Sequence, residues 1–431
     1  MIGRMRPVDR WHRAAFAAGM GARFVWERAS TGIVFNPRAK GMREDPYPFY
    51  RRLRERDPVH RSATMDGYVL TRYRDVLDVL GDRSHSAEDR NWRRWPRILE
   101  LLAAAGEPDP YVDGSPTMLR LDPPDHTRLR GLVSKAFSPR AIDGWRPRIE
   151  NLAQELLDAL PAHGEIDLVE ALAAPLPVVV IAELLGVPVA DRDRFRRWSE
   201  DVAASLGDGG PEIAARARRA TGELGAYMLG IADDRRREPR DDLISALVAA
   251  EEEGDRLSRE ELASTCVLLL VAGNETTTKL IGNGVLALLR NPSQLRWLRE
   301  EPKRIEGAVE EILRYDGTVQ FTSRVAMRDG EIAGRPIRAG QQVALVLAAA
   351  NRDPERFAEP DRFDIGREDN RHLAFSHGTH FCLGSRLARL ETRVAIEALA
   401  TRLPGLALAD EPVRYSPNTI LRGPDRLPLR Y

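Results

Sequence analysis

The sequence predicts a mainly α-helical protein with small β-sheets, folded as one large domain. Residues 122–250 follow the helical period almost throughout, and a single apolar helical pattern runs from Ser258 to Leu289. The strand-like segments do not alternate with helices as βαβ units require. No linker, repeat or low-complexity stretch divides the 431 residues. We therefore expect a single domain over residues 41–431, behind an N-terminal extension over residues 1–40.

The N-terminal part mixes helices and strands. The extension, with Trp11, Phe16 and Trp26, predicts an amphipathic surface helix. The next patterns predict a helix over Pro46–Glu55, strands over Val59–Thr71 that turn at Asp66-Gly67, and a helix over Tyr73–Leu80. Between Ser84 and Met118 the periodicity fails and Pro, Gly and Asp accumulate, which predicts a binding loop or lid containing a short helix over Arg97–Ala105.

The middle of the chain is predicted to be helical. Helices are expected after Pro123-Pro124 and over Arg146–Leu160, Pro177–Leu185, Asp191–Ala204 and Pro211–Arg237. Ser258 and Glu261 form a capping-box signature at the start of the long apolar pattern. A helix of that length measures ~48 Å, so we expect it to thread the centre of the domain. Gly inside a helix costs ~1 kcal/mol relative to Ala, so Gly273 in the middle of this helix calls for a reason.

The C-terminal third combines strands and helices. The patterns predict a helix over Arg304–Tyr315, strands over Thr318–Met327, Glu331–Ile337 and Gln342–Leu347 with turns at Asp329-Gly330 and Ala339-Gly340, an irregular segment over Leu373–Leu383, a helix over Gly384–Thr401 and a β-ribbon over Leu406–Tyr431.

Composition excludes several classes of protein. Hydrophobic residues are 43% of the chain, and 65 basic residues balance 65 acidic ones, so disorder and an electrostatic footprint for nucleic acid are both disfavoured. No run of ~20 apolar residues predicts a membrane span or anchor. The two cysteines, Cys266 and Cys382, allow no disulfide framework, which favours a reducing, cytoplasmic location.

Cys382 is the strongest candidate for chemistry. It ends a glycine-containing loop that opens directly into a helix, where backbone N–H groups favour a thiolate. Such a thiolate can be a nucleophile, a zinc ligand or a haem ligand. A structural zinc site needs four ligands, and His377, His380 and Cys382 supply three at most. No base is marked for a Cys-His nucleophile. The residues alone therefore favour thiolate–iron binding and leave the other two readings open.

The pattern Phe375-x-x-Gly378-x-His380-x-Cys382-x-Gly384 resembles the cysteine loop of cytochromes P450. The resemblance extends from about Pro46 to Arg430, and it implies the soluble bacterial type with a single triangular-prism domain. It also implies that Cys382 is the proximal axial ligand of haem b (iron protoporphyrin IX), which favours O–O cleavage. Phe375 would pack beside the sulfur, and Gly384 would let the helix begin near the porphyrin.

The central helix resembles the family's distal helix. The resemblance implies a local π-type widening at the small residues Ala272 and Gly273, which would leave space for O₂ above the iron. Glu275 and Thr276 match the family's acid–alcohol pair, although many relatives carry aspartate in place of the glutamate. The resemblance implies that Thr276 donates a hydrogen bond to oxygen while Glu275 relays protons. A threonine that bonds its own helix carbonyl is the alternative for Thr276.

Two further charged sets match the family. Glu311 and Arg314 correspond to its Glu-x-x-Arg motif, which implies a buried network with Arg367 that shapes the haem cradle; Arg362 is the rival for the third position, and a surface ion pair is the alternative. Haem carries two propionates. The residues that match propionate ligands are His126, Arg130, Arg324 and His380.

Substrate residues follow from position within the family. The loop over residues 84–118 and the mainly apolar residues Leu268, Leu269, Val271, Val319, Phe321, Thr419 and Ile420 are expected to line a pocket for a lipophilic ligand, and Gln320 to hydrogen-bond it. Each of these can equally be plain core.

The implied activity is monooxygenation with electrons from NAD(P)H. The chain has no dinucleotide fingerprint or four-cysteine cluster, so a ferredoxin or flavodoxin with its reductase is implied as partner. The expected docking patch consists of Arg128, Lys135, Arg386, Arg389 and Arg393. A monomer is the family default. The alternatives are an H₂O₂-driven peroxygenase, which tends to lack the acid–alcohol pair, and a non-catalytic haem sensor or carrier.

Overall fold

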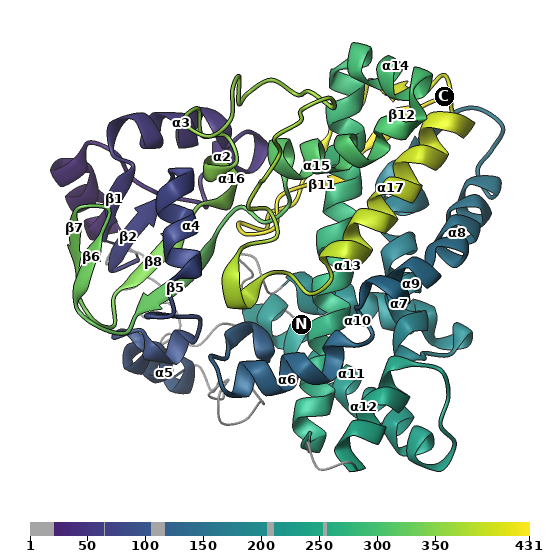
Figure 1. Cartoon of the computed structure of the whole chain (residues 1–431), viewed down its shortest axis with the longest axis horizontal. Helices are drawn as coiled ribbons and strands as arrows, with labels where there is room; N and C mark the ends of the chain where they lie inside the picture. The colour runs from purple at the N-terminus through teal and green to yellow at the C-terminus, as the bar shows by residue number, and fades with distance from the viewer. Residues whose placement is uncertain (1–20, 64, 105–116, 205–210, 253–256) are drawn as a thin grey trace, which may run out of the picture.

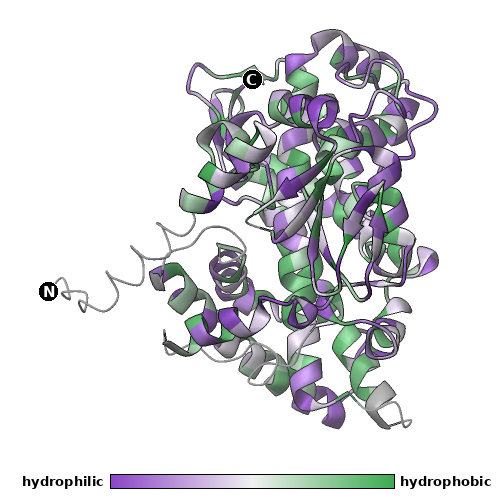
Figure 2. Cartoon of the chain, turned by 90° about the vertical axis from the view of Figure 1, so that its left-hand side faces the viewer, coloured by the Kyte–Doolittle hydropathy of each residue, from purple (hydrophilic) through white to green (hydrophobic). Residues whose placement is uncertain are grey.

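The computed structural model describes residues 21–63, 65–104, 117–204, 211–252 and 257–431. Trp11 and Phe16, and residues 105–116 of the expected binding loop, lie outside this part of the chain. A sheet with its covering helices forms one side of the molecule, and the longer helices gather on the other side (Figure 1). Figure 2 shows hydrophobic segments in the middle of the molecule and hydrophilic ones over much of its periphery.

The main sheet has five strands in the order β1-β2-β8-β5-β3, and only β2 and β8 run parallel. The strands are β1 (Val59–Ser62), β2 (Gly67–Leu70), β3 (His85–Ser86), β5 (Thr322–Ala326) and β8 (Gln342–Leu345). Successive side chains of a strand point to opposite faces. Tyr68 and Leu70 accordingly join the cluster under α4 (Tyr73–Gly81), and Val69 joins the cluster under α3 (Tyr47–Arg56). Helices on both faces explain why β2 is buried along its whole length and β8 along most of it.

The helical side is organised around α13 (Arg259–Arg290), which is buried along most of its length. Its neighbours include α9 (Pro175–Leu185), α10 (Arg192–Ala204), α11 (Pro211–Arg237), α15 (Ile305–Asp316) and α17 (Ser385–Arg402). The remaining α-helices are α2 (Lys40–Glu44), α5 (Trp95–Ala104), α6 (Asp125–Ser134), α7 (Pro139–Gly144), α8 (Arg146–Asp158), α12 (Leu243–Glu252), α14 (Pro292–Glu300) and α16 (Leu347–Ala350). A mainly α architecture with small sheets is therefore confirmed.

The central helix begins as predicted. The Ser258 hydroxyl accepts from the Glu261 N–H, and the Glu261 carboxylate accepts from the Ser258 N–H. The expected π-type widening at Ala272 and Gly273 is wrong, because α13 is regular α-helix through both residues. The space there comes from small side chains instead: Ala272 is exposed in the middle of a helix that is otherwise mostly buried.

The C-terminal strands differ from the expected single ribbon. β10 (Arg414–Tyr415) pairs with β11 (Pro424–Arg426), whereas β12 (Pro428–Arg430) lies between β4 (Glu165–Asp167) and β9 (Ala407–Leu408). The chain thus divides these strands between two sheets, and β4 comes from a segment that sequence reasoning placed among helices. The expected single strand over Glu331–Ile337 is instead a hairpin of β6 (Gly330–Ile332) and β7 (Arg335–Ile337), which turns at Ala333-Gly334, both with positive φ. The chain bends at residues 327–329 before this hairpin, at the predicted turn.

Residues 21–31 are helical and are tied to the main sheet. Buried Glu27 accepts hydrogen bonds from the backbone N–H groups of Phe35 and Ala63 and lies 2.9 Å from the His60 imidazole. Phe35 is fully buried in the cluster that covers α3. No described helix is long and apolar enough to cross a membrane.

Candidate active site

The cysteine loop is held in a fixed shape by its own backbone. The Cys382 N–H donates to the Phe375 carbonyl at 2.9 Å, and the Phe381 N–H donates to the Gly378 carbonyl at 3.0 Å. Gly378 has φ +70°, and a Cβ there would lie 2.6 Å from the Leu80 carbonyl oxygen, so only glycine fits this turn. Cys382 is thereby placed just ahead of α17.

The Cys382 side chain is exposed to solvent although protein surrounds it. That surrounding protein desolvates the thiol and raises its pKa, while a backbone hydrogen bond from Gly384 and the charges of Arg130 and Arg389 act in the opposite direction. A Cβ added at Gly384 would meet no atom within 4 Å. The exposed Cys382 therefore lies close to a glycine at which the described protein leaves room for a side chain. Cys266 differs: it is fully buried in α13, and burial raises its pKa to about 12.

Four nitrogen-bearing side chains gather near the cysteine loop. The rings of His126 on α6 and His380 in the loop have centroids 4.3 Å apart. The Arg130 guanidinium donates to the Phe381 carbonyl at 2.7 Å, and buried Arg324 on β5 donates to the Ser323 carbonyl at 2.7 Å. These two contacts are to backbone oxygens, and no carboxylate of the described chain forms an ion pair with Arg130 or Arg324.

The four groups destabilise one another's charge. Desolvation, followed by the positive charge of Arg324, lowers the pKa of His380 to about 3. Desolvation and then Arg130 lower the pKa of His126, and desolvation also lowers the pKa of both arginines. His126 Nδ1 is buried and has no hydrogen-bond partner among the described residues. Arg130 and Arg324 therefore carry positive charge that no ion pair neutralises, with Asp122 as the nearby opposing charge, and such a cluster is suited to binding an anion.

Glu275 and Thr276 lie on neighbouring strips of α13. The Thr276 hydroxyl donates to the Ala272 carbonyl, which is the local bond that the alternative reading expected, and the Thr318 hydroxyl donates to the Thr276 carbonyl at 3.0 Å. The Glu275 carboxylate is part-buried and lies 3.3 Å from the Lys279 ammonium. In this structure the acid is therefore turned toward Lys279.

The expected substrate residues come together from two distant segments. The Gln320 N–H donates to the Ile420 carbonyl at 2.9 Å, and Val319 forms a β-bridge with Leu421, which brings residues 319–321 beside 419–421. Leu268 and Val271 lie on α13, and Gly273 is in ordinary contact with Ile181.

Two of these residues face the N-terminal part of the chain. The Gln320 amide donates to the Gly317 carbonyl at 3.0 Å, and its carbonyl lies 3.3 Å from the Tyr50 hydroxyl. Phe321 packs edge-on against Phe35, with ring centroids 6.1 Å apart. Buried Gln320 thus has both ends of its amide occupied by protein, which leaves a substrate role without support.

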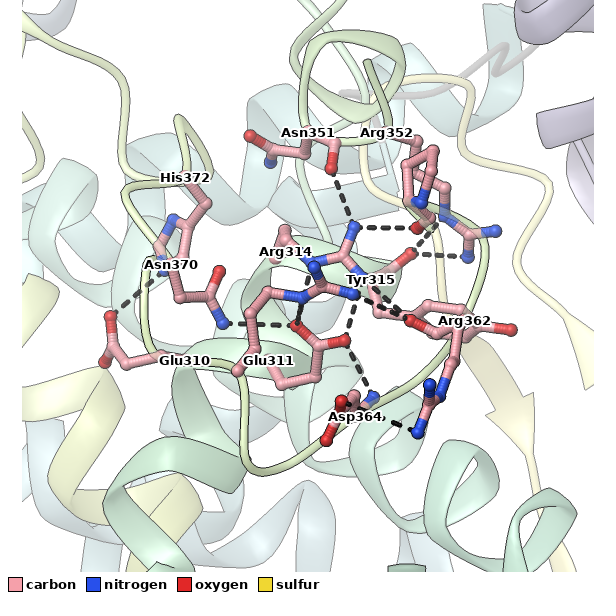
Figure 3. A network of polar contacts seen from close by, with 12 residues as sticks. Glu310, Glu311, Arg314, Tyr315, Asn351, Arg352, Arg362, Asp364, Asn370 and His372 are labelled. Carbon is pink, nitrogen blue, oxygen red and sulfur yellow. Dashed lines mark hydrogen bonds and ion pairs between the residues drawn. The ribbon is translucent and has the colours of Figure 1, made fainter. Parts of the chain in front are cut away.

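Glu311 and Arg314 on α15 are fully buried, so this is no surface ion pair. Figure 3 shows how the loop before the cysteine wraps around them. Arg314 donates twice to Glu311, at 2.7 and 2.8 Å, and its other three N–H bonds go to backbone carbonyls of Asn351, Pro360 and Arg362. All five guanidinium donors are satisfied.

The third member of this network is Arg367. Its Nε lies 3.2 Å from Glu311 Oε2, and the Asn370 amide and the Asp364 N–H also donate to Glu311. Arg362 contributes its carbonyl oxygen to Arg314, and its exposed side chain pairs with Glu359 at 2.9 Å and lies 3.8 Å from Asp364, as Figure 3 shows for the second contact. The carboxylate of Glu311 therefore fixes the loop that leads to the cysteine.

Sequence reasoning missed Glu310, which holds an arginine against the cysteine loop. The Arg389 guanidinium lies over the Phe375 ring, 4.5 Å from its centroid, and donates twice to Glu310. Burial alone would raise the pKa of Glu310, but hydrogen bonds from Arg389 and His372 lower it to about 2. The residue in the sequence that could have indicated this pair is Arg389, which the sequence analysis places in the docking patch.

Buried Glu391 on α17 was also missed. Desolvation raises its pKa to about 8, and its one polar partner is Thr277 on α13. Among the described residues no three His, Cys, Asp or Glu side chains form a group that could hold a metal ion.

Comparison with known proteins gives concordant matches. The family described as Cytochrome P450 matches residues 212–403. The chain is 45% identical over 393 residues to Vitamin D(3) 25-hydroxylase of Pseudonocardia autotrophica, covering 90% of this chain and 94% of that protein. It is 43% identical over 396 residues to cytochrome P450 monooxygenase PikC of Streptomyces venezuelae, covering 90% and 91%. The crystal structure of a myxobacterial cytochrome P450, CYP267B1, in complex with myristic acid is similar with a TM-score of 0.82 and 42% identity, covering 90% of this chain and 97% of the other.

Proposed function

Because this chain belongs to the cytochrome P450 family and is a haem-thiolate monooxygenase, we propose that it hydroxylates a C–H bond of a lipophilic small molecule. The family binds haem b through a cysteine thiolate and requires a redox partner, an organic substrate and O₂. When bound, the haem supplies activation of O₂ at its iron. The observation that carries the proposal is the accessible Cys382 beside a cluster of basic groups without acidic partners.

The residues around Cys382 fit a haem. Cys382 would bind the iron, and Gly384 and Ala272 would leave room for the flat ring, since one has no neighbour within 4 Å of a Cβ and the other is exposed within α13. The propionates would meet His126, Arg130, Arg324 and His380. Two carboxylates there would supply the missing counter-charge and an acceptor or donor for the unpartnered His126 Nδ1.

Thr276 and Glu275 would handle protons on the distal side. The Thr276 hydroxyl would exchange its bond to the Ala272 carbonyl for a bond to oxygen, and the Thr318 hydroxyl would keep the helix backbone satisfied at this point. Glu275 would carry protons inward while the apolar residues around it exclude bulk water. The intact pair favours a monooxygenase over a peroxygenase.

The substrate is proposed to be lipophilic. The residues proposed to contact it are Leu268, Leu269, Val271, Val319, Phe321, Thr419 and Ile420, and apolar linings of this kind suit lipophilic ligands. Two relatives support this class by name, one as a vitamin D(3) hydroxylase and one as a complex with myristic acid. Gln320 is removed from the set because its amide is occupied.

A ferredoxin or flavodoxin is proposed to dock on the cysteine side. Of the five proposed contact residues, Arg128, Arg386, Arg389 and Arg393 are paired with Glu261, Asp143, Glu310 and Glu306. Their attraction for an acidic partner is thereby reduced. Lys135 is exposed and has no ion pair among the described residues, so Lys135→Glu should slow reduction and weaken its salt dependence most. An unchanged rate and salt dependence would remove this docking site.

The remaining parts of the proposal concern organisation. We propose a monomer with one domain over residues 41–431, to which the N-terminal segment is tied through Glu27. A cytoplasmic location is supported by two free cysteines.

Two measurements test the function. The reduced, carbon-monoxide-treated protein is expected to develop the absorption band of a cysteine-ligated haem, which Cys382→Ala should abolish. Compounds that change the haem spin state are then converted with NAD(P)H, ferredoxin and reductase. Hydroxylated product in that system supports the proposal. Turnover at the same rate with H₂O₂ alone would identify a peroxygenase, and ligand binding without turnover in either system would identify a sensor or carrier.

A further inference from the structure

Lys279 is a buried lysine in the middle of the central helix. Its side chain is 4% exposed and lies between two carboxylates, those of Glu275, at 19% exposure, and Asp425, at 45%. Its ammonium contacts Glu275 Oε1 at 3.3 Å, the Pro424 carbonyl at 3.2 Å, and Asp425 Oδ1. An ammonium has three N–H donors, and here each finds an acceptor. Lys279 thus links Asp425, which is partly exposed, to the acid of the acid–alcohol pair.

The surrounding backbone is shaped to admit this side chain. A Cβ at Gly423 would lie 2.5 Å from the Cβ of Lys279, so the backbone at Gly423 passes directly over the aliphatic part of the lysine side chain. A Cβ at Gly282, one turn along the helix, would lie 2.7 Å from Pro424 Cγ. The Asn283 amide also donates to the Arg422 carbonyl at 3.1 Å. The segment over residues 422–425 is therefore packed tightly on α13, and the position of the ammonium is fixed by both segments.

This arrangement determines where the Glu275 carboxylate lies. Residues four apart share a helix face, so Ala272 and Thr276 form one strip, and Glu275 and Lys279 form the next. Lys279 turns the Glu275 carboxylate toward residues 422–425 and away from the exposed Ala272.

We propose that Lys279 is a positioning residue that holds the Glu275 carboxylate turned toward residues 422–425, with Asp425 as its solvent-facing anchor. The inference rests on the proposed function, in which Glu275 relays protons on the distal side. Without the ammonium, Glu275 loses its counter-charge and its fixed orientation. Proton delivery then loses its control, and reducing equivalents leave as hydrogen peroxide in place of product.

The test compares Lys279→Met, which keeps the stem and removes the charge, with Lys279→Arg, which keeps the charge. Lys303→Met is the matched control, because Lys303 is a lysine with 84% exposure. The absorption band of the reduced, carbon-monoxide-treated protein is recorded first for all three. Absence of the band from the wild-type protein would overturn the proposed function and not this inference.

The first readout is the infrared carboxyl band of Glu275 in protein labelled with ¹³C-glutamate. The band is assigned to Glu275 by its loss in Glu275→Gln. In Lys279→Met it is expected to shift from its wild-type frequency, because the carboxylate loses its contact with the ammonium, and it should keep that frequency in Lys279→Arg and Lys303→Met. The second readout is peroxide released per NAD(P)H oxidised with a hydroxylated substrate, which should rise severalfold in Lys279→Met and return toward wild type in Lys279→Arg.

A merely structural ion pair predicts a different result. Lys279→Met would then lower the melting temperature but leave the carboxyl band and the peroxide fraction as in wild type, which would overturn the proposal. If Lys279→Met does not fold, Lys279→Gln takes its place, since an amide keeps a hydrogen bond to Glu275 but no charge. The same two readouts decide, with the same expected and contrary results.

Discussion

The guanidinium of Arg389 lies over the ring of Phe375, 4.5 Å from the ring centroid. Phe375 belongs to the loop that holds Cys382. Its charge lowers the pKa of the Cys382 thiol, which burial alone raises. Glu310 fixes the guanidinium through two hydrogen bonds, at 2.6 and 2.9 Å. The Arg389 guanidinium is therefore placed to stabilise negative charge on the Cys382 sulfur. Its removal should change the reduction potential of a haem bound to that sulfur.

Arg389→Leu is expected to lower the reduction potential of the haem. Removing a nearby cation leaves more negative charge on the thiolate, which disfavours addition of an electron. At a partly exposed site the effect should amount to tens of millivolts, on the order of 1 kcal/mol. Potentiometric titration measures it. Arg393→Leu, one turn further along α17 and paired with Glu306, is the control that should leave the potential in place.

Arg324→Ala is expected to weaken haem retention. Arg324 is buried and its described contacts reach no carboxylate, so a propionate is its natural partner. Hydrogen bonds to a charged group contribute ~1.5–3 kcal/mol, which corresponds to a haem dissociation rate roughly 10- to 100-fold higher. Transfer of haem to apomyoglobin measures that rate. Arg328→Ala removes an exposed arginine just beyond the same strand, and an equal effect there would contradict the assignment.

Arg314→Lys is expected to destabilise the fold by about 3–5 kcal/mol, because a lysine cannot satisfy the five acceptors that the buried guanidinium serves. Chemical unfolding monitored by circular dichroism measures the free energy. Arg362→Lys changes an exposed side chain in the same network and should shift the free energy by less than about 1 kcal/mol. Equal shifts in both variants would mean that the network contributes no more than a surface pair.

Glu391 is expected to make stability fall as the pH rises. Desolvation raises its pKa from 4.5 to about 8, so between these values the unfolded chain releases a proton that the folded chain keeps. The free energy of unfolding therefore decreases from about pH 4.5 to about pH 8. Glu391→Gln should remove this slope and add about 3 kcal/mol at pH 7. Unfolding of both proteins across this range measures the difference, and parallel profiles would contradict the shifted pKa.

Thr276→Ala is expected to separate turnover from ligand binding. The variant should bind haem and substrate as the wild-type protein does, because the hydroxyl contacts only its own helix. It should nevertheless release most reducing equivalents as hydrogen peroxide. Peroxide and product are measured per NAD(P)H oxidised. Unchanged coupling would exclude Thr276 from proton delivery and would fit a sensor or carrier better.

Much of this fold could be predicted from the sequence because local signals and tertiary packing agree. The capping box at Ser258 and the apolar run behind it define α13 without knowledge of its neighbours. The pairing of β4 with β12 could not be predicted, because Asp167 and Pro428 lie far apart in the chain and neither segment has a strand pattern long enough to stand out.

Part of the candidate site could also be predicted from the sequence, and part of it could not. The spacing of Glu311 and Arg314 indicated a pair, and the loop around them is consistent with the family motif. The charges that surround the site were missed because ion pairs form between distant segments. Arg389 was assigned to a docking patch on its charge alone, although Glu310 occupies it. Gln320 was judged by its neighbours in sequence, whereas Tyr50 is its neighbour in space.

The completeness of hydrogen bonding around Arg314 has a consequence for the order of assembly. Every acceptor of its guanidinium belongs to the polypeptide, and none is contributed by a porphyrin. The newly synthesised chain can therefore form the cradle for its prosthetic group before that group arrives.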